Sequence, residues 1–163
     1  MTKEQTHFES PPRRRVAGQA VLIHPDDERV LLLDRADHPR HRLPGGHAAP
    51  DEPAHRTVRR LVRAQLGVTL PFTGADLAAV DYSPANRSTG GHEGYTFVFA
   101  LRLTTARAAT ARPGPGLLGF DWTAPEHLST VCDDHHVRRI SEALAWYAVQ
   151  GSAALLVNGA LAA

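Results

Sequence analysis

Two short apolar runs near the start of the chain predict a β-hairpin. Residues 16–24 and 29–34 are rich in Val, Leu and Ile, and the four residues between them, 25–28, are polar or turn-forming. Apolar runs of this length bounded by turn residues are typical of strands, and short connections of this kind join antiparallel ones. The sequence therefore predicts that a sheet begins here.

The pattern becomes helical after residue 53. Between Pro53 and Leu66 the apolar side chains recur at intervals of three and four, which is the spacing of one helix face. Pro53 suits the first turn of a helix, and Gly67 suits the residue that ends one. Arginines occupy the opposite side of this predicted helix: Arg56, Arg59, Arg60 and Arg63.

The rest of the chain predicts further strands and a second long helix. Strands are expected at residues 77–82, 94–103 and 117–122, with turn-rich stretches between them. A short helix is expected at residues 125–129. A long helix should follow, with Asp133 or Asp134 as its N-terminal cap and one apolar face. The residues of that face are Val137, Ile140, Leu144 and Tyr147.

A spaced set of glycines, charged residues and aliphatic residues runs from Gly46 to Val68. It matches six of the nine defined positions of the pattern G-x5-E-x7-R-E-U-x-E-E-x-G-U, where U is aliphatic. The matching residues are Gly46, Glu52, Arg60, Val62, Gly67 and Val68. This string resembles the Nudix box, and the order of the predicted elements over residues 14–150 is similar to that of a Nudix domain.

The resemblance implies an α/β fold, a Nudix-type α/β/α sandwich with a mixed central sheet. Residues 1–13 would form a flexible N-terminal arm, residues 14–150 the domain, and residues 151–163 a C-terminal tail. It also implies kinship with hydrolases of nucleoside diphosphates linked to another moiety. By this resemblance, Glu52 and Arg60 of this chain would brace the loop of the box against its helix.

Three acidic positions of the box are replaced in this chain. Where the family carries glutamates that hold magnesium, the sequence has Leu61, Ala64 and Gln65. Magnesium prefers anionic oxygens, which leucine and alanine lack and which a glutamine amide replaces poorly. We therefore expect no metal at these positions, and weak or absent pyrophosphohydrolase activity. Magnesium or manganese would bind only if residues outside the box rebuild the site.

Other residues are candidates for chemistry or ligand contact. Glu93, which precedes the strand at 94–103, could act as a metal ligand or general base, with Gln65 as a weak ligand; a solvated glutamate at a strand end is the alternative. Basic and imidazole side chains near the Gly45–Gly46 turn suit phosphate, although a solvated polar loop is the plainer interpretation. The candidates for ligand contact are Arg35, Arg42, Gly46, His47, Leu61, Ala64 and Tyr95.

Three alternatives stay open at this point. All three place the site in a cleft between the Gly46 loop, the helix at 53–66 and the strand after Glu93. The chain could be a pyrophosphohydrolase of altered type, a non-catalytic sensor or interaction module for a small nucleotide-like molecule, or a metal-independent enzyme that uses this cleft. The expected partner is a small, phosphorylated ligand, and a homodimer stays open. Substitutions that remove carboxylates favour binding over hydrolysis.

Composition narrows the classes of partner. The chain has a net charge of +1, with 42% hydrophobic and 21% charged residues, which is ordinary for a globular domain and gives no basis for binding a nucleic-acid polymer or a membrane. A single cysteine, Cys132, cannot form an internal disulfide, and residues 1–15 lack the apolar core of a signal peptide. These features predict a cytoplasmic protein.

Overall fold

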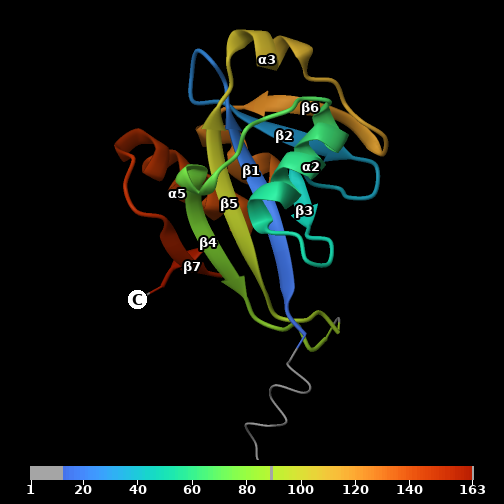
Figure 1. Ribbon diagram of the computed structural model, residues 1–163, viewed down its shortest axis with the longest axis vertical. Helices are drawn as coiled ribbons and strands as arrows, with labels where there is room; N and C mark the ends of the chain where they lie inside the picture. The colour runs from blue at the N-terminus through green and yellow to red at the C-terminus, as the bar shows by residue number, and fades with distance from the viewer. Residues whose placement is uncertain (1–12, 89, 163) are drawn as a thin grey trace, which may run out of the picture.

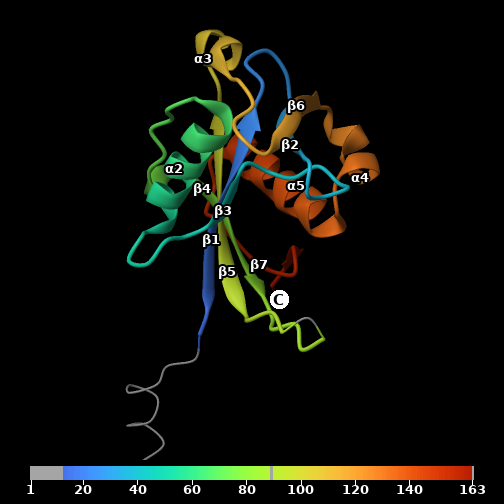
Figure 2. The same cartoon turned by 90° about the vertical axis from the view of Figure 1, so that its right-hand side faces the viewer.

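The computed structural model describes residues 13–88 and 90–162, and within them two helical layers enclose one sheet (Figures 1 and 2). The strands are β1 (Arg15–Ile23), β2 (Val30–Arg35), β3 (Gly45–His47), β4 (Leu77–Ser83), β5 (Gly94–Arg102), β6 (Leu117–Thr123), β7 (Ala154–Val157) and β8 (Ala160–Leu161). The helices are α2 (Ala54–Leu66), α3 (Thr105–Thr110), α4 (Leu128–Val131) and α5 (Asp134–Val149), with 3-10 turns η1 (Gly74–Asp76) and η2 (Pro125–His127). The predicted α/β sandwich is confirmed.

The sheet is mixed, as expected. Its order is β6-β2-β1-β5-β4-β7-β8, and β3 pairs with β1 outside this path. The hairpin predicted at the start of the chain is present, since β1 and β2 are antiparallel with Ile23 opposite Val30. β1 also runs parallel to β5 along its whole length, and β7 runs parallel to β4.

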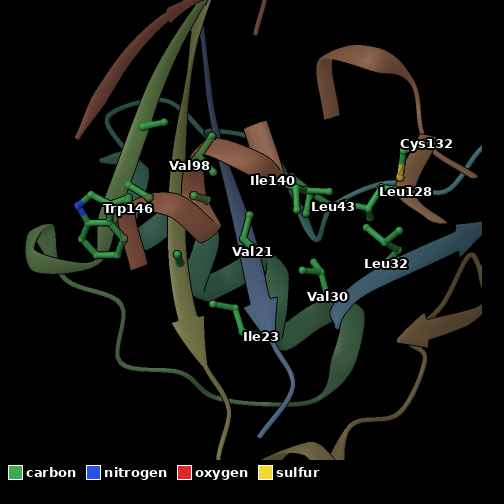
Figure 3. Packing of buried hydrophobic residues seen from close by; sticks show 14 of the residues in the cluster. Val21, Ile23, Val30, Leu32, Leu43, Val98, Leu128, Cys132, Ile140 and Trp146 are labelled. Carbon is green, nitrogen blue, oxygen red and sulfur yellow. The ribbon is translucent and has the colours of Figure 1, made fainter. Parts of the chain in front are cut away.

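Both faces of the central strands are covered, which explains their nearly continuous apolar sequence. Along β1, Val21 and Ile23 belong to the cluster that packs under α5, whereas Ala20 and Leu22 belong to the cluster under α2. Figure 3 shows the α5 side of this core around Val21 and Ile140. Figure 2 shows α2 and α5 on opposite sides of the sheet.

Helix α2 begins and ends close to where the sequence predicts. Pro53 is its N-cap rather than its first helical residue, and Gly67 ends it with a φ of 70°, a left-handed conformation that glycine adopts without strain. Val58, Val62 and Leu66 are fully buried on its inner face. The short helix expected at residues 125–129 is instead η2 followed by α4, and α3 and β3 were not predicted.

The segment predicted as a C-terminal tail contains two short strands. Residues 154–161 add β7 and β8 to the sheet beside β4. Leu156 is fully buried while its neighbours Leu155 and Val157 are exposed, the alternation of a strand with one covered face. A strand of four residues is too short for this alternation to stand out in the sequence. Residues 1–12, most of the predicted N-terminal arm, lie outside the described part.

A buried ion pair connects the C-terminal strands with the rest of the domain. Asp81 on β4 is fully buried and accepts a hydrogen bond from Nε of Arg139 on α5 at 2.6 Å. Its second oxygen accepts from the backbone N–H of Gly159 at 3.0 Å, and Arg139 also donates to the side chain of Gln19 on β1 at 3.0 Å. One carboxylate thus joins α5, β4 and the turn between β7 and β8.

A membrane-crossing helix is absent from residues 13–88 and 90–162, because no helix there combines the required length with sufficient apolar character.

The substitution Asp81→Ala should destabilise the domain strongly. It leaves the guanidinium of Arg139, which is only 5% exposed, without its counter-charge. Removing one partner of a buried pair costs about 3–5 kcal/mol, so we expect a large drop in the urea midpoint of unfolding. Asp121→Ala, on an exposed strand position of β6, is the matched control and should change little. Equal midpoints for the two variants would contradict this role of the pair.

Candidate functional site

A cavity of about 490 Å³ lies on the face of the sheet that α5 covers. Ala17 and Gln19 of β1 line it, and they point to the same side as Val21 and Ile23 because alternate residues of a strand share a face. Its other walls come from β3, β5, the N-terminal turns of α5 and the loop after β7. Its arginine and histidine side chains are Arg15, Arg35, Arg42, Arg139, His47, His135 and His136.

The Gly45–Gly46 turn, which the structure places at the start of strand β3, forms one edge of this cavity and lies unusually close to β1. Gly45 has a φ of 128°, and a Cβ at this position would lie 2.1 Å from the carbonyl oxygen of Gly18. No residue with a side chain fits there. Gly45 stands opposite Gln19 in the β1–β3 pairing. The glycine pair therefore brings the backbone of the box into the cavity wall.

Gln65 holds this turn on the helix. Its Oε1 accepts a hydrogen bond from the backbone N–H of Gly45 at 2.8 Å, and its Nε2 donates to the carbonyl oxygen of the same residue at 3.0 Å. Both polar atoms of the amide are therefore used within the protein. A role for Gln65 as a weak metal ligand stays a prediction.

The other two replaced positions of the box offer no ligand either. Leu61 packs toward the turn, since its Cδ1 lies 3.3 Å from an ideal Cβ on Gly46. Ala64 is exposed and lines a separate shallow groove along the arginine side of α2, together with Arg59 and Arg63. Neither residue lines the cavity, so the structure does not bring these two predicted contact residues to its wall. The residues at the family's magnesium position do not fit that ion.

Glu52 and Arg60 form a bidentate ion pair. Arg60 donates from Nε to Oε1 at 2.7 Å and from Nη2 to Oε2 at 2.8 Å. Glu52 also accepts from the backbone N–H of Ala49 and from the hydroxyl of Thr57. These bonds, first that of Arg60, lower the pKa of Glu52 to about 2. The pair joins the loop of the box to the middle of α2, away from the cavity.

Glu93 lies beside the cavity rather than in its wall. Its two oxygens accept from Nε of Arg14 at 2.6 Å and from the hydroxyl of Tyr82 at 2.7 Å. These bonds, with that of Tyr82 first, lower the pKa of the carboxyl group. Within the described residues, no three side chains of His, Cys, Asp or Glu are grouped closely enough to hold a metal ion. A role for Glu93 in catalysis stays a prediction.

The arginines of the cavity differ in how their charge is compensated. Arg35 forms a two-bond pair with Asp37, and Arg139 pairs with Asp81. Arg15 donates to a backbone carbonyl, that of His92, at 2.7 Å. Nε of Arg42 is buried and has no hydrogen-bond partner in the described structure. No aspartate or glutamate lines the described cavity, so its wall favours an anion.

Two histidines at the start of α5 add neutral polar groups to the wall. His136 is 2% exposed and its Nδ1 has no partner among the described residues. Burial lowers the pKa of His136 to about 2, and burial followed by the charge of Arg139 lowers that of His135. Both imidazoles are therefore neutral at physiological pH. Asp133 is the N-cap residue of α5, but its side chain makes no capping bond and pairs with Arg40 instead.

The side chains of His38 and Cys132 lie outside the cavity. Nδ1 of His38 lies 3.0 Å from the backbone carbonyl oxygen of Arg40, two residues further along the chain. Cys132 is buried, and burial raises the pKa of its thiol to about 11, so the thiolate is scarce. Neither arrangement points to chemistry.

The structure brings five of the predicted ligand-contact residues into one wall. These are Arg35, Arg42, Gly46, His47 and Tyr95. Of the cleft expected between the Gly46 loop, the helix at 53–66 and the strand after Glu93, the loop and the strand line this cavity, and its remaining wall comes from α5 rather than from α2. The contribution of Arg139 was missed, although it interrupts the buried stripe of α5 between His136 and Ile140. A charged residue on an otherwise apolar face was the available signal.

The family model described as NUDIX domain matches residues 13–147. No curated protein sequence matches the chain. Among solved structures, the MutT protein of Methanosarcina mazei has a TM-score of 0.65 at 18% identity, over 85% of this chain and 97% of the other.

Two further structures are similar to this chain. The MutT NUDIX hydrolase of Burkholderia pseudomallei has a TM-score of 0.64 at 22% identity, covering 80% of this chain and 98% of its own. The NUDIX domain of Shewanella oneidensis NrtR, solved with ADP-ribose, has a TM-score of 0.64 at 19% identity, over 88% and 97%. At these identities the likeness concerns the fold. Because the family model spans most of its length, the chain belongs to the Nudix family.

Proposed function

We propose that this Nudix protein binds a small, phosphorylated ligand in the cavity under α5 and does not cleave it by the metal-dependent route of the box. The single observation that carries the proposal is the wall of the cavity, which has four arginines and, in its described part, no carboxylate. Guanidinium groups recognise phosphate oxygens through paired, charge-assisted hydrogen bonds. A wall of this composition suits recognition of an anion.

The replaced box positions favour binding over hydrolysis. Cleavage of a diphosphate requires that charge on the phosphate oxygens be neutralised and that a water be activated, tasks that bound metal ions perform in many enzymes. Here Gln65 is committed to Gly45, Leu61 is apolar, and Ala64 lies on another groove. The neutral imidazole of His136 is a hydrogen-bonding group for the ligand rather than a cation.

ADP-ribose is a suitable first probe, because a structurally similar NUDIX domain was solved with it. We expect saturable binding to the purified protein by calorimetry in the presence of EDTA. No nucleotide product should accumulate on prolonged incubation with magnesium or manganese. Rapid metal-dependent release of product would instead favour a hydrolase of altered type, with Glu93 as the first residue to substitute.

Arg42→Gln should weaken ADP-ribose binding. Arg42 lines the cavity with a buried Nε that has no partner in the described structure, so a phosphate oxygen would gain a charged hydrogen bond. Such a bond is worth about 1.5–3 kcal/mol, which corresponds to a roughly ten- to hundredfold rise in Kd. Arg107→Gln on the exposed side of α3 removes the same charge elsewhere and should leave Kd unchanged. Equal Kd values for the two variants would show that the ligand does not bind in this cavity.

Gln65→Glu should lower stability and create no hydrolase. A glutamate restores the family residue but cannot donate to the carbonyl oxygen of Gly45, which would then face a carboxylate. A carbonyl oxygen inside the protein that loses its hydrogen-bond donor costs about 1–3 kcal/mol. The Tm of Gln65→Glu should therefore fall, and so should that of the companion variant Gln65→Ala. An unchanged Tm together with new magnesium-dependent turnover would show that Gln65 occupies a working metal position.

A further inference from the structure

We infer that the cavity takes its ligand as a magnesium-free diphosphate diester, and that magnesium weakens binding. This inference rests on the proposed function and deepens it. In the family pattern a metal would neutralise the diphosphate, whereas in this chain the neutralising charges belong to the protein.

The charge of the wall supports a doubly negative ligand. Four arginines line the cavity, and carboxylates compensate two of them, Asp37 for Arg35 and Asp81 for Arg139. Arg15 donates to the backbone carbonyl of His92, and the buried Nε of Arg42 has no partner, so neither guanidinium pairs with a carboxylate of the described residues. Two positive charges that no described carboxylate compensates therefore face the ligand. A diphosphate with a substituent on each phosphorus carries two negative charges at neutral pH, so the charges match without a metal.

The complex of the same diphosphate with magnesium has no net charge. It would lose the attraction of Arg15 and Arg42, and its metal ion would lie among guanidinium groups of the same sign. Arginine and magnesium also seek the same phosphate oxygens. The free diphosphate should therefore bind more tightly than its magnesium complex.

Residues 13–88 and 90–162 offer the metal no compensating carboxylate cluster near the Gly45–Gly46 turn. The carbonyl oxygen of Gly45 already accepts from Nε2 of Gln65 at 3.0 Å, and Leu61 presents a methyl group to Gly46. Glu52 is held by Arg60, and Glu93 by Arg14 and Tyr82. The described structure therefore has no cluster of carboxylates that could bind a cation.

The effect has a definite size. If only the free diphosphate binds, magnesium acts as a competitor that sequesters the ligand. The apparent Kd then rises by the factor 1 + [Mg²⁺]/K, where K is the dissociation constant of the magnesium complex of the ligand. At a magnesium concentration about ten times K, apparent binding should be roughly elevenfold weaker.

The test is calorimetric titration of the full chain with ADP-ribose, first in EDTA and then in a series of magnesium concentrations. K for magnesium and ADP-ribose is measured separately by the same method. Ionic strength is kept equal with sodium chloride, because salt alone screens the arginines. The double substitution Arg15→Gln and Arg42→Gln should weaken binding in EDTA. It should also reduce the magnesium effect, because it removes the charges that favour the free diphosphate over its magnesium complex. Arg107→Gln should change neither.

The outcomes separate the two proposals. A rise in apparent Kd that follows the factor above supports the inference. Tighter or unchanged binding in magnesium overturns it, while ligand binding, and with it the proposed function, stands. Absence of binding in every buffer overturns the proposed function and this inference with it.

Discussion

The close approach of the Gly45–Gly46 turn to β1 is the constraint on which the candidate site depends. A Cβ at Gly45 would lie 2.1 Å from the carbonyl oxygen of Gly18, so the turn can rest there only because it has no side chain. Two hydrogen bonds between Gly45 and Gln65, one donated by each residue, fix the turn to α2 from the other side. The turn therefore joins one helical layer to the sheet and shapes the edge of the cavity under the other layer.

This arrangement explains why a box without its glutamates can retain its shape. In the family pattern the helix presents carboxylates toward the turn, which is compatible with a bound cation. Here an amide, a leucine and an alanine stand at the same positions, and the amide makes direct bonds to the backbone. The amide thus bonds directly to the backbone at a position where the family pattern has a carboxylate. The neighbouring pair of Glu52 and Arg60 holds the other end of the loop.

Much of the fold could be predicted from local sequence. The hairpin, α2 and strands β4 to β6 have apolar periodicity and turn residues that specify them almost to the residue. The strands β3 and β7 could not be predicted, because β3 has three residues, two of them glycine, and β7 shows too few alternations. Both depend on pairing with distant strands, which no local pattern reports.

The candidate site was predictable only in part, for a related reason. Residues close to the box in sequence, such as Arg42 and His47, lie in the cavity wall as expected. The opposite wall comes from α5, ninety residues later in the chain, and from its buried residues His136 and Arg139. Their position relative to the box follows from the sheet order β1-β5-β4, because α5 packs on β4 and β5 and reaches β1. Only the tertiary structure shows that these side chains share a cavity.

Phosphorus NMR of ADP-ribose mixed with the protein tests the central claim most directly, because one spectrum reports both binding and cleavage. If the protein binds ADP-ribose without cleaving it, the two diphosphate resonances should broaden or shift as protein is added. No phosphate monoester resonance should grow when magnesium is present. Steady growth of monoester resonances at the expense of the diphosphate, abolished by chelator, would contradict a binding function and would mean that a working metal site exists despite the replaced glutamates.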